Sequence, residues 1–147
     1  MKKTLEPYEE NWNFEEAFCN DINNKNFPIP FFSIIALFAE DANYGLKDCY
    51  VHGNRLFIRG RTKGRTNELM LRYHGQTELV VARIQFVHRR KGNMTELYRI
   101  LKRIQKKYHT GPIAIESVTT EEMEAWCIKN KFQKVGRNYI QPGKYND

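Results

Sequence analysis

The segment from Leu79 to Tyr108 constrains the fold of this chain more than any other. It reads LVVARIQFV, then HRRKGNM, then TELYRILKRIQKKY. The pattern predicts an apolar strand that passes through a short basic turn into an amphipathic helix. The first backbone N–H groups of such a helix have no partner within it and converge on one point, where an anion can bind. The cationic side chains of the turn surround that point: Arg89, Arg90 and Lys91. The turn therefore suits a diphosphate.

The turn does not match the two best-known phosphate-binding motifs. A P-loop needs a longer glycine-rich loop that ends in Gly-Lys-Ser/Thr, and a dinucleotide-binding fold needs three spaced glycines. The six residues RRKGNM instead resemble the Arg/Gln-x-x-Gly-x-Gly/Ala signature of the GNAT superfamily of N-acetyltransferases, which grips the pyrophosphate of coenzyme A. Arg89 and Gly92 match this signature, whereas Met94 stands where the family prefers glycine or alanine.

The residues that follow extend the resemblance. GPIAIESV (Gly111 to Val118) has the pattern of a second buried strand, and TTEEMEAWCIKNKF (Thr119 to Phe132) that of a helix leading into another strand. The family ends similarly, with a strand and then a helix that closes on aromatic-Tyr-x-x-x-Gly-Phe. The resemblance covers roughly Lys47 to Tyr139, about two-thirds of the chain.

Within that closing motif, some positions match and others depart. Trp126 and Phe132 fit its aromatic positions, but the family's Tyr falls on Cys127 and its Gly on Lys131. These departures, together with Met94, favour a slow enzyme or a protein that has lost catalysis.

The N-terminal third is expected to be helical. Asn13 and Glu16 are spaced as a capping box for a helix of about Phe14 to Asn24. Pro30 is well placed at the start of a second helix that ends near Gly45, and the apolarity of this helix on all sides predicts burial.

Four strand-like runs follow the helical part. CYVH and RLFIRG are separated by Gly53-Asn54, and NELMLRY and TELVVARIQFV by His74-Gly75-Gln76, so consecutive hairpins predict an antiparallel meander. Alternation in the last run predicts one apolar face, made of Val80, Ala82, Ile84 and Phe86. The strand, helix and strand from 79 to 118 predict a parallel βαβ unit.

Together these patterns predict one α/β domain of α+β type over residues 1–147. The resemblance implies a mixed, mostly antiparallel sheet, flanked by helices on both faces and containing one parallel βαβ unit. We expect a helical part over residues 1–46, a sheet and cofactor-binding core over 47–140, and a frayed tail over 141–147.

The resemblance also implies a reaction, the transfer of an acetyl group from acetyl-coenzyme A to an amine that the sequence does not identify. The residues expected to bind the cofactor are Phe86, Val87, Arg89, Arg90, Lys91, Gly92, Asn93, Met94 and Thr95. The strand that ends at Val87 would supply a backbone N–H to the thioester carbonyl. No residue spacing indicates a metal site.

Acyl transfer requires that the amine lose a proton, that the carbonyl be polarised and that the leaving thiolate be neutralised. Glu116 is the first candidate for the general base and His88 the second. Cys127 stands at the family's general-acid position, but it is smaller than tyrosine, so we expect it to pack in the helix and line the thiol end of the cofactor. Tyr139 is another proton donor to consider.

Composition and length limit the remaining classes of protein. A hydrophobic content of 41% with 13% aromatic residues excludes general disorder. The 147 residues suffice for one core. The three cysteines have no metal-ligand spacing, and the N-terminus lacks the apolar stretch of a signal peptide. The apolar run 27–39 is too short to span a bilayer. We therefore expect a soluble cytoplasmic protein.

Charge is unevenly distributed and leaves two functions open. Residues 1–46 have a net charge of −5, residues 47–109 of +12 and residues 110–147 of zero. The basic middle would attract coenzyme A or nucleic acid. The chain is therefore either an N-acyltransferase or a catalytically weak or inactive basic protein that binds nucleic acid or a protein partner. The loop from Arg59 to Glu68 is the best local candidate for a weak, non-specific contact with nucleic acid, and it is equally a candidate for a mobile hairpin tip. The basic face of the helix after the basic turn is expected to be a solvated surface rather than a nucleic-acid stripe.

Overall fold

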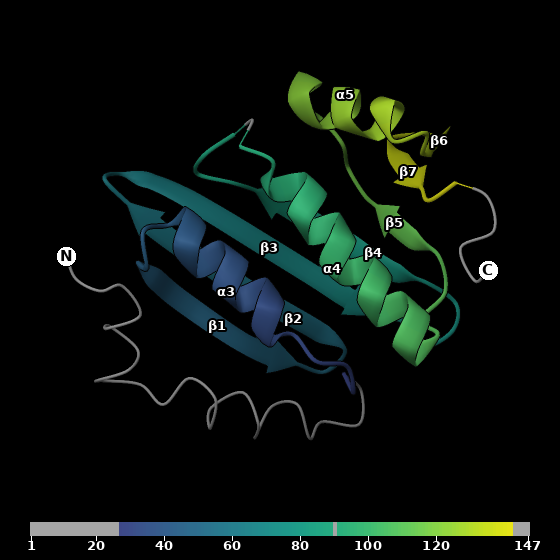
Figure 1. Cartoon of the computed structure of the whole chain (residues 1–147), viewed down its shortest axis with the longest axis horizontal. Helices are drawn as coiled ribbons and strands as arrows, with labels where there is room; N and C mark the ends of the chain where they lie inside the picture. The colour runs from purple at the N-terminus through teal and green to yellow at the C-terminus, as the bar shows by residue number, and fades with distance from the viewer. Residues whose placement is uncertain (1–26, 90, 143–147) are drawn as a thin grey trace.

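A computed structural model of the chain describes residues 27–89 and 91–142. In this part of the chain it contains a seven-stranded sheet and three helices (Figure 1). The helices are α3 (Phe32–Asp41), α4 (Asn93–Tyr108) and α5 (Glu121–Lys129). The strands are β1 (Leu46–His52), β2 (Arg55–Thr62), β3 (Arg65–Tyr73), β4 (Leu79–Gln85), β5 (Ile113–Ile115), β6 (Gln133–Val135) and β7 (Asn138–Ile140). The mixed class with a mostly antiparallel sheet agrees with the prediction.

The first four strands form the predicted antiparallel meander. β1 and β2 meet at the turn Gly53–Asn54, as expected. The basic segment from Arg59 to Glu68 is mostly strand rather than loop, because β2 continues to Thr62 and β3 begins at Arg65. Its only turn residues are Lys63 and Gly64, at the tip of the hairpin.

Helix α4 connects two parallel strands, which confirms the predicted βαβ unit. Residues Leu79–Val81 of β4 pair in parallel with Ile113–Ile115 of β5. β5 is therefore shorter than the predicted run of residues 111–118. The sheet continues beyond it with β7 and β6, an antiparallel hairpin where the sequence analysis expected a single strand, and the strand order is β1-β2-β3-β4-β5-β7-β6.

A bulge in β4 changes which of its residues face the core. In the ladder with β3, the partnered residues pass from Arg83 directly to Val81. Ala82 between them is an extra residue, and the alternation of side chains shifts by one at that point. The core-facing residues of β4 and its continuation are Leu79, Val81, Ile84 and Phe86. The predicted face contained only the last two of these, because a strict period of two cannot cross a bulge.

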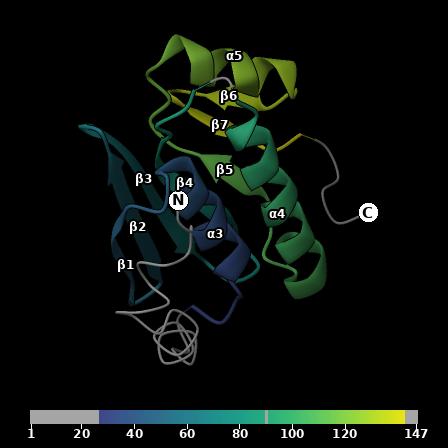
Figure 2. The ribbon, with the colours of Figure 1, turned by 60° about the vertical axis from the view of Figure 1, so that its left-hand side comes forward.

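Helices α3 and α4 lie side by side on one face of the sheet (Figures 1 and 2). Helix α5 contacts α4 through the rings of Trp126 and Tyr98, whose centroids are 5.3 Å apart. Helices were predicted on both faces, but the two longest described helices share one. On the other face, Tyr50 stacks on Phe57, and Tyr50 is 45% exposed.

Some predicted elements fall at the ends of the chain. The helix expected for residues 14–24, and most of the tail expected after residue 140, lie outside the described residues. The second predicted helix is α3, which begins two residues after Pro30 and ends at Asp41, before the expected end near Gly45. Among the described residues, no helix is long and apolar enough to cross a membrane.

The end of α3 approaches the sheet closely at Gly60 of β2. A Cβ atom placed on Gly60 would lie 2.7 Å from the Cβ of Ala42 and 2.8 Å from Oδ1 of Asn67. The side-chain amide of Asn67 also donates a hydrogen bond to the carbonyl oxygen of Phe38 in α3, at 2.9 Å. The absence of a side chain at Gly60 therefore lets the end of α3 lie directly against β2 and β3.

We predict that Gly60→Ala lowers the free energy of unfolding by about 1–3 kcal/mol, because the added methyl group has no room. Arg61→Ala, a change at the exposed neighbouring position, should alter the same quantity by no more than about 0.5 kcal/mol. Urea unfolding of the three proteins measures both values. Equal stability of Gly60→Ala and the wild type would contradict the close approach.

Candidate functional site

Strands β4 and β5 diverge after three paired residues. β5 ends at Ile115, while β4 continues to Gln85, so within the described chain the last residues of β4 pair with β3 alone. A cavity of about 530 Å³ lies between the end of β4, the start of α4 and α5. This volume lies within the range of roughly 300–1,000 Å³ that is usual for small-molecule sites.

Four segments form the wall of this cavity: the end of β4, the basic turn, the first turn of α4, and α5 with the residue before it. The lining residues are Ile84, Gln85, Phe86, His88, Arg89, Gly92, Asn93, Met94, Thr95, Thr120, Glu121, Glu122, Met123, Ala125, Trp126 and Lys129. Six of the nine residues predicted to bind the cofactor are among them.

Two of the other three predicted cofactor residues, Val87 and Lys91, do not line the cavity. Val87 is buried, and its backbone N–H points away to another partner, Asp41. Lys91 is exposed and outside the wall. Arg90 lies outside the described residues. The backbone N–H expected for the thioester carbonyl would therefore have to come from a residue before Val87.

Helix α4 begins at the cavity without a side-chain cap. Its N-cap is Gly92, which has a left-handed φ of 78° that glycine adopts without strain. The first backbone hydrogen bond into the helix runs from the N–H of Glu96 to the carbonyl oxygen of Gly92, at 3.0 Å. The N–H groups of Asn93, Met94 and Thr95 consequently have no acceptor within the helix, and the helix dipole favours an anion beside them.

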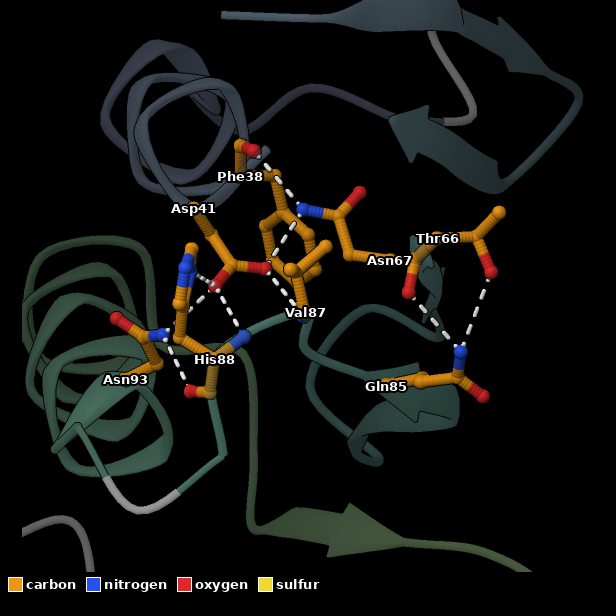
Figure 3. A network of polar contacts seen from close by, with 8 residues as sticks. All are labelled: Phe38, Asp41, Thr66, Asn67, Gln85, Val87, His88 and Asn93. Carbon is orange, nitrogen blue, oxygen red and sulfur yellow. Dashed lines mark hydrogen bonds and ion pairs between the residues drawn. The ribbon is translucent and has the colours of Figure 1, made fainter. Parts of the chain in front are cut away.

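Behind this wall lies a buried carboxylate, that of Asp41, the last residue of α3 (Figure 3). It accepts hydrogen bonds from the backbone N–H groups of Val87 at 2.7 Å and of His88 at 2.9 Å. It also accepts from the side-chain amides of Asn67 at 2.8 Å and of Asn93 at 3.1 Å. These donors belong to β3, to the turn after β4 and to α4. One carboxylate therefore holds three segments of the site against the end of α3.

The sequence analysis did not select Asp41. Its side chain has no solvent exposure, and a buried charge is stable only where hydrogen bonds replace its hydration. The available signal was a charged residue near the end of FSIIALFAED, a helix predicted to be buried. That signal indicates a partner for the carboxylate but does not say which segments supply it.

His88, the second candidate for the general base, lies on the cavity wall and contacts the same carboxylate. Its Nδ1 is 3.2 Å from Oδ1 of Asp41, and 46% of its side chain is exposed. If Nδ1 carries the proton that bonds to Asp41, Nε2 carries the lone pair, which is the arrangement a general base needs. This tautomer is assigned from the contact.

Glu116, the first candidate for the base, lies elsewhere. Its carboxylate forms an ion pair with Arg72, and it is not among the cavity-lining residues. Both side chains lie on the face of the sheet away from α4, because their neighbours Leu71 and Ile115 face the core and side chains alternate along a strand. Glu116 therefore lies away from the cavity wall, paired with Arg72.

Cys127 was expected to line the thiol end of the cofactor. It is instead a core residue of α5 and is not part of the cavity wall. Burial and the nearby charge of Glu124 raise the pKa of its thiol to about 12, so the thiol stays protonated near neutral pH. The hydroxyl of Tyr139 donates a hydrogen bond to Glu124 at 3.2 Å. Burial is the larger cause that raises the pKa of Tyr139, and this hydrogen bond is the next. Neither proton donor lies on the wall.

Helix α5 forms the opposite wall and brings negative charge to it. The indole N–H of Trp126 donates a hydrogen bond to Oγ1 of Thr95 at 3.1 Å, which ties α5 to the first turn of α4. Glu121 and Glu122 line the cavity, and Glu122 lies 4.0 Å from Arg89. The sequence analysis did not identify these acids. The cavity thus has a basic side at the turn and an acidic side at α5.

Comparison with known proteins found no family model, no curated protein and no solved structure that matches this chain. Among the described residues, no group of three or more His, Cys, Asp or Glu side chains is arranged to hold a metal ion. The resemblance to the GNAT superfamily therefore remains a proposal, and its support comes from the geometry of the site.

We predict that Asp41→Ala lowers the free energy of unfolding by roughly 3–5 kcal/mol, because it leaves several buried donors without an acceptor. Asp48→Ala is the matched control, since Asp48 bonds to Arg59 at 2.6 Å but is 45% exposed. Its cost should stay below about 1 kcal/mol. Chemical denaturation compares the two, and equal losses would show that Asp41 does not hold the site together.

Proposed function

We propose that the chain binds acetyl-coenzyme A and transfers its acetyl group to an amine. The observation that carries this proposal is the cavity of about 530 Å³ beside the end of β4 and the uncapped start of α4. A strand that is unpaired on one side and a helix N-terminus together offer backbone donors along a path. An extended ligand with an anionic centre is the kind of molecule that such a path suits.

In this proposal the diphosphate of the cofactor lies at the first turn of α4. The free N–H groups of Asn93 to Thr95 would bond to its oxygens, and the helix dipole would add attraction. Arg89, on the cavity wall, would contribute a formal positive charge. Gly92 leaves open space there, since a Cβ atom placed on it would meet no atom within 4 Å. A phosphate can therefore approach the backbone.

The acyl arm of the cofactor would then follow the free side of β4. Between Ala82 and Phe86 the strand has no β5 neighbour, so its backbone groups on that side are available to the amides of an extended ligand. Ile84 and Phe86 provide apolar wall for the methylene groups. The thioester, at the far end of the arm from the diphosphate, would lie along β4 toward Ala82.

His88 lines the cavity but contacts Asn93 at the diphosphate end, so we assign it as general base acting through water in the cavity rather than by direct contact. Its Nε2 would accept a proton as the amine nitrogen attacks the thioester carbonyl, and Asp41 would stabilise the resulting imidazolium. Collapse of the tetrahedral intermediate forms the amide bond and breaks the carbon–sulfur bond. The sulfur leaves as thiolate and takes up a proton, so the products are the N-acetylated amine and the free thiol of coenzyme A.

We predict that coenzyme A raises the melting temperature of the protein, with a gain of about 2.7 kcal/mol at one hundred times its dissociation constant. Gly92→Glu should abolish this shift while the protein stays folded, because its carboxylate would occupy and repel the phosphate site. Gly64→Glu is the matched control: Gly64 has the same φ of 78° and equally open surroundings, but lies at the tip of the β2–β3 hairpin.

The control should melt at about the temperature of Gly92→Glu without ligand, and it should keep the shift with coenzyme A. Thermal unfolding followed by circular dichroism gives both quantities. A wild-type melting temperature that does not move in millimolar coenzyme A would refute the proposed function. A shift that persists in Gly92→Glu would move the site away from α4.

We predict further that His88→Gln lowers the turnover number at least 100-fold and leaves the affinity for coenzyme A within a factor of about three, since general-base catalysis contributes about 10²–10⁴-fold. Glu116→Gln, away from the cavity wall, should change neither quantity by more than a few-fold. The assay follows release of the coenzyme A thiol from acetyl-coenzyme A in the presence of primary amines. A larger loss in Glu116→Gln than in His88→Gln would reverse the assignment.

A further inference from the structure

The outward side of α4 carries positive charge along most of its length. Five exposed side chains form what we call the α4 basic stripe: Arg99, Lys102, Arg103, Lys106 and Lys107. They recur three and four residues apart, which places them on one side of the helix, opposite its buried residues. The only acidic residue of α4 is Glu96, which pairs with Arg99. In the described structure the other four cations have no ion pair with an acidic side chain.

Solubility alone does not require this pattern. A solvated helix gains from mixed charges, because opposite charges three or four residues apart attract and like charges repel. Helix α5 has such a mixture, with Glu121, Glu122 and Glu124 followed by Lys129. The dipole of α4 favours Lys106 and Lys107 in its last turn, but it gives no reason for the cations before them.

The chemistry of the stripe selects among anionic partners. Insertion into a membrane surface needs an apolar face beside the cations, and a tight protein interface needs aromatic or aliphatic anchors. From Arg99 to Lys107 the stripe has neither: Tyr98 is buried beneath Lys102, whose Nζ lies 4.4 Å from the ring centroid. Tyr108, at 38% exposed, lies at the far end of the helix. Phosphodiester groups require only the positive charge that is present.

We infer that the α4 basic stripe binds the phosphate backbone of nucleic acid without reading its sequence. Arg99 to Lys107 extends over about 12 Å of helix axis, and a duplex carries one negative charge per roughly 1.7 Å, so all five cations can face phosphates. The first turn is the only part of α4 that lines the cavity, and the stripe begins beyond it. This inference is independent of the proposed acyl transfer.

The test measures binding of the full chain to labelled 20-nucleotide probes by fluorescence anisotropy from 50 to 300 mM salt. The probes are single-stranded RNA, duplex RNA and duplex DNA of mixed sequence. The variant Arg103→Gln/Lys106→Gln/Lys107→Gln removes three charges of the stripe. Its slope of log affinity against log salt should be shallower than that of the wild type by about 2.7 on duplex DNA and about 2 on single strands. Comparison of the RNA and DNA probes identifies which nucleic acid is preferred.

Arg61→Gln/Lys63→Gln/Arg65→Gln is the matched control, because it removes three exposed charges from the β2–β3 hairpin tip and gives the same net charge. It should keep the wild-type slope to within about 1. Equal losses in the two variants would show either that binding follows net charge or that the hairpin tip contacts nucleic acid as well, and either result would overturn the inference. The inference would also be overturned if the wild type bound none of the nucleic-acid probes at 50 mM salt. The same holds if, in a parallel measurement, it bound vesicles that contain phosphatidylserine but none of these probes. Melting curves of both variants, with and without coenzyme A, test ligand binding at the cavity separately from nucleic-acid binding.

Discussion

The hydrogen bonds to the Asp41 carboxylate hold this structure together at its functional end. They join the end of α3 to β3, to the turn after β4 and to the first turn of α4, three segments that are distant in sequence. The geometry depends on charge, because a neutral acceptor in a site without solvent exposure would attract these donors less strongly. Asp41 also contacts His88, so the carboxylate that fixes the turn also orients the residue assigned as the base. In the proposed reaction, folding and chemistry would thus share one group.

The divergence of β4 from β5 gives the fold its capacity for a ligand. A parallel pair of only three residues leaves the end of β4 unpaired on its β5 side, and the Trp126–Thr95 hydrogen bond ties α5 to the first turn of α4. The chain therefore combines, at one cavity, a strand edge and a helix N-terminus, the two backbone features that recognise extended anionic molecules. The basic turn and the acidic start of α5 give the cavity two electrically different sides. A negatively charged cofactor and a positively charged amine would each find a complementary side.

Much of this architecture follows from local sequence patterns, and the rest depends on contacts that local patterns do not encode. The period of α4, the Gly53–Asn54 turn and the parallel βαβ unit were predicted correctly, because each is set by neighbouring residues. The two-residue turn at Lys63–Gly64 was missed, because the basic residues around it read as a loop. The bulge at Ala82 was missed, since an extra residue in a strand has no compositional signature here. Glu116 looked like a base because it follows a buried strand, but its partner Arg72 is 44 positions away in sequence and draws it to the other face. Asp41 was missed for the same reason: all its hydrogen-bond donors are at least 26 residues away in sequence.

The most direct test of the central claim is a titration of isotopically labelled protein with coenzyme A, followed through the backbone amide resonances. If the diphosphate binds at the start of α4, the largest shifts will belong to the amides of Asn93, Met94 and Thr95, with smaller ones along the end of β4. The amide of Val87 should move little, because its hydrogen bond to Asp41 is already made. Shifts confined to the outward side of α4, or none at millimolar coenzyme A, would contradict the account.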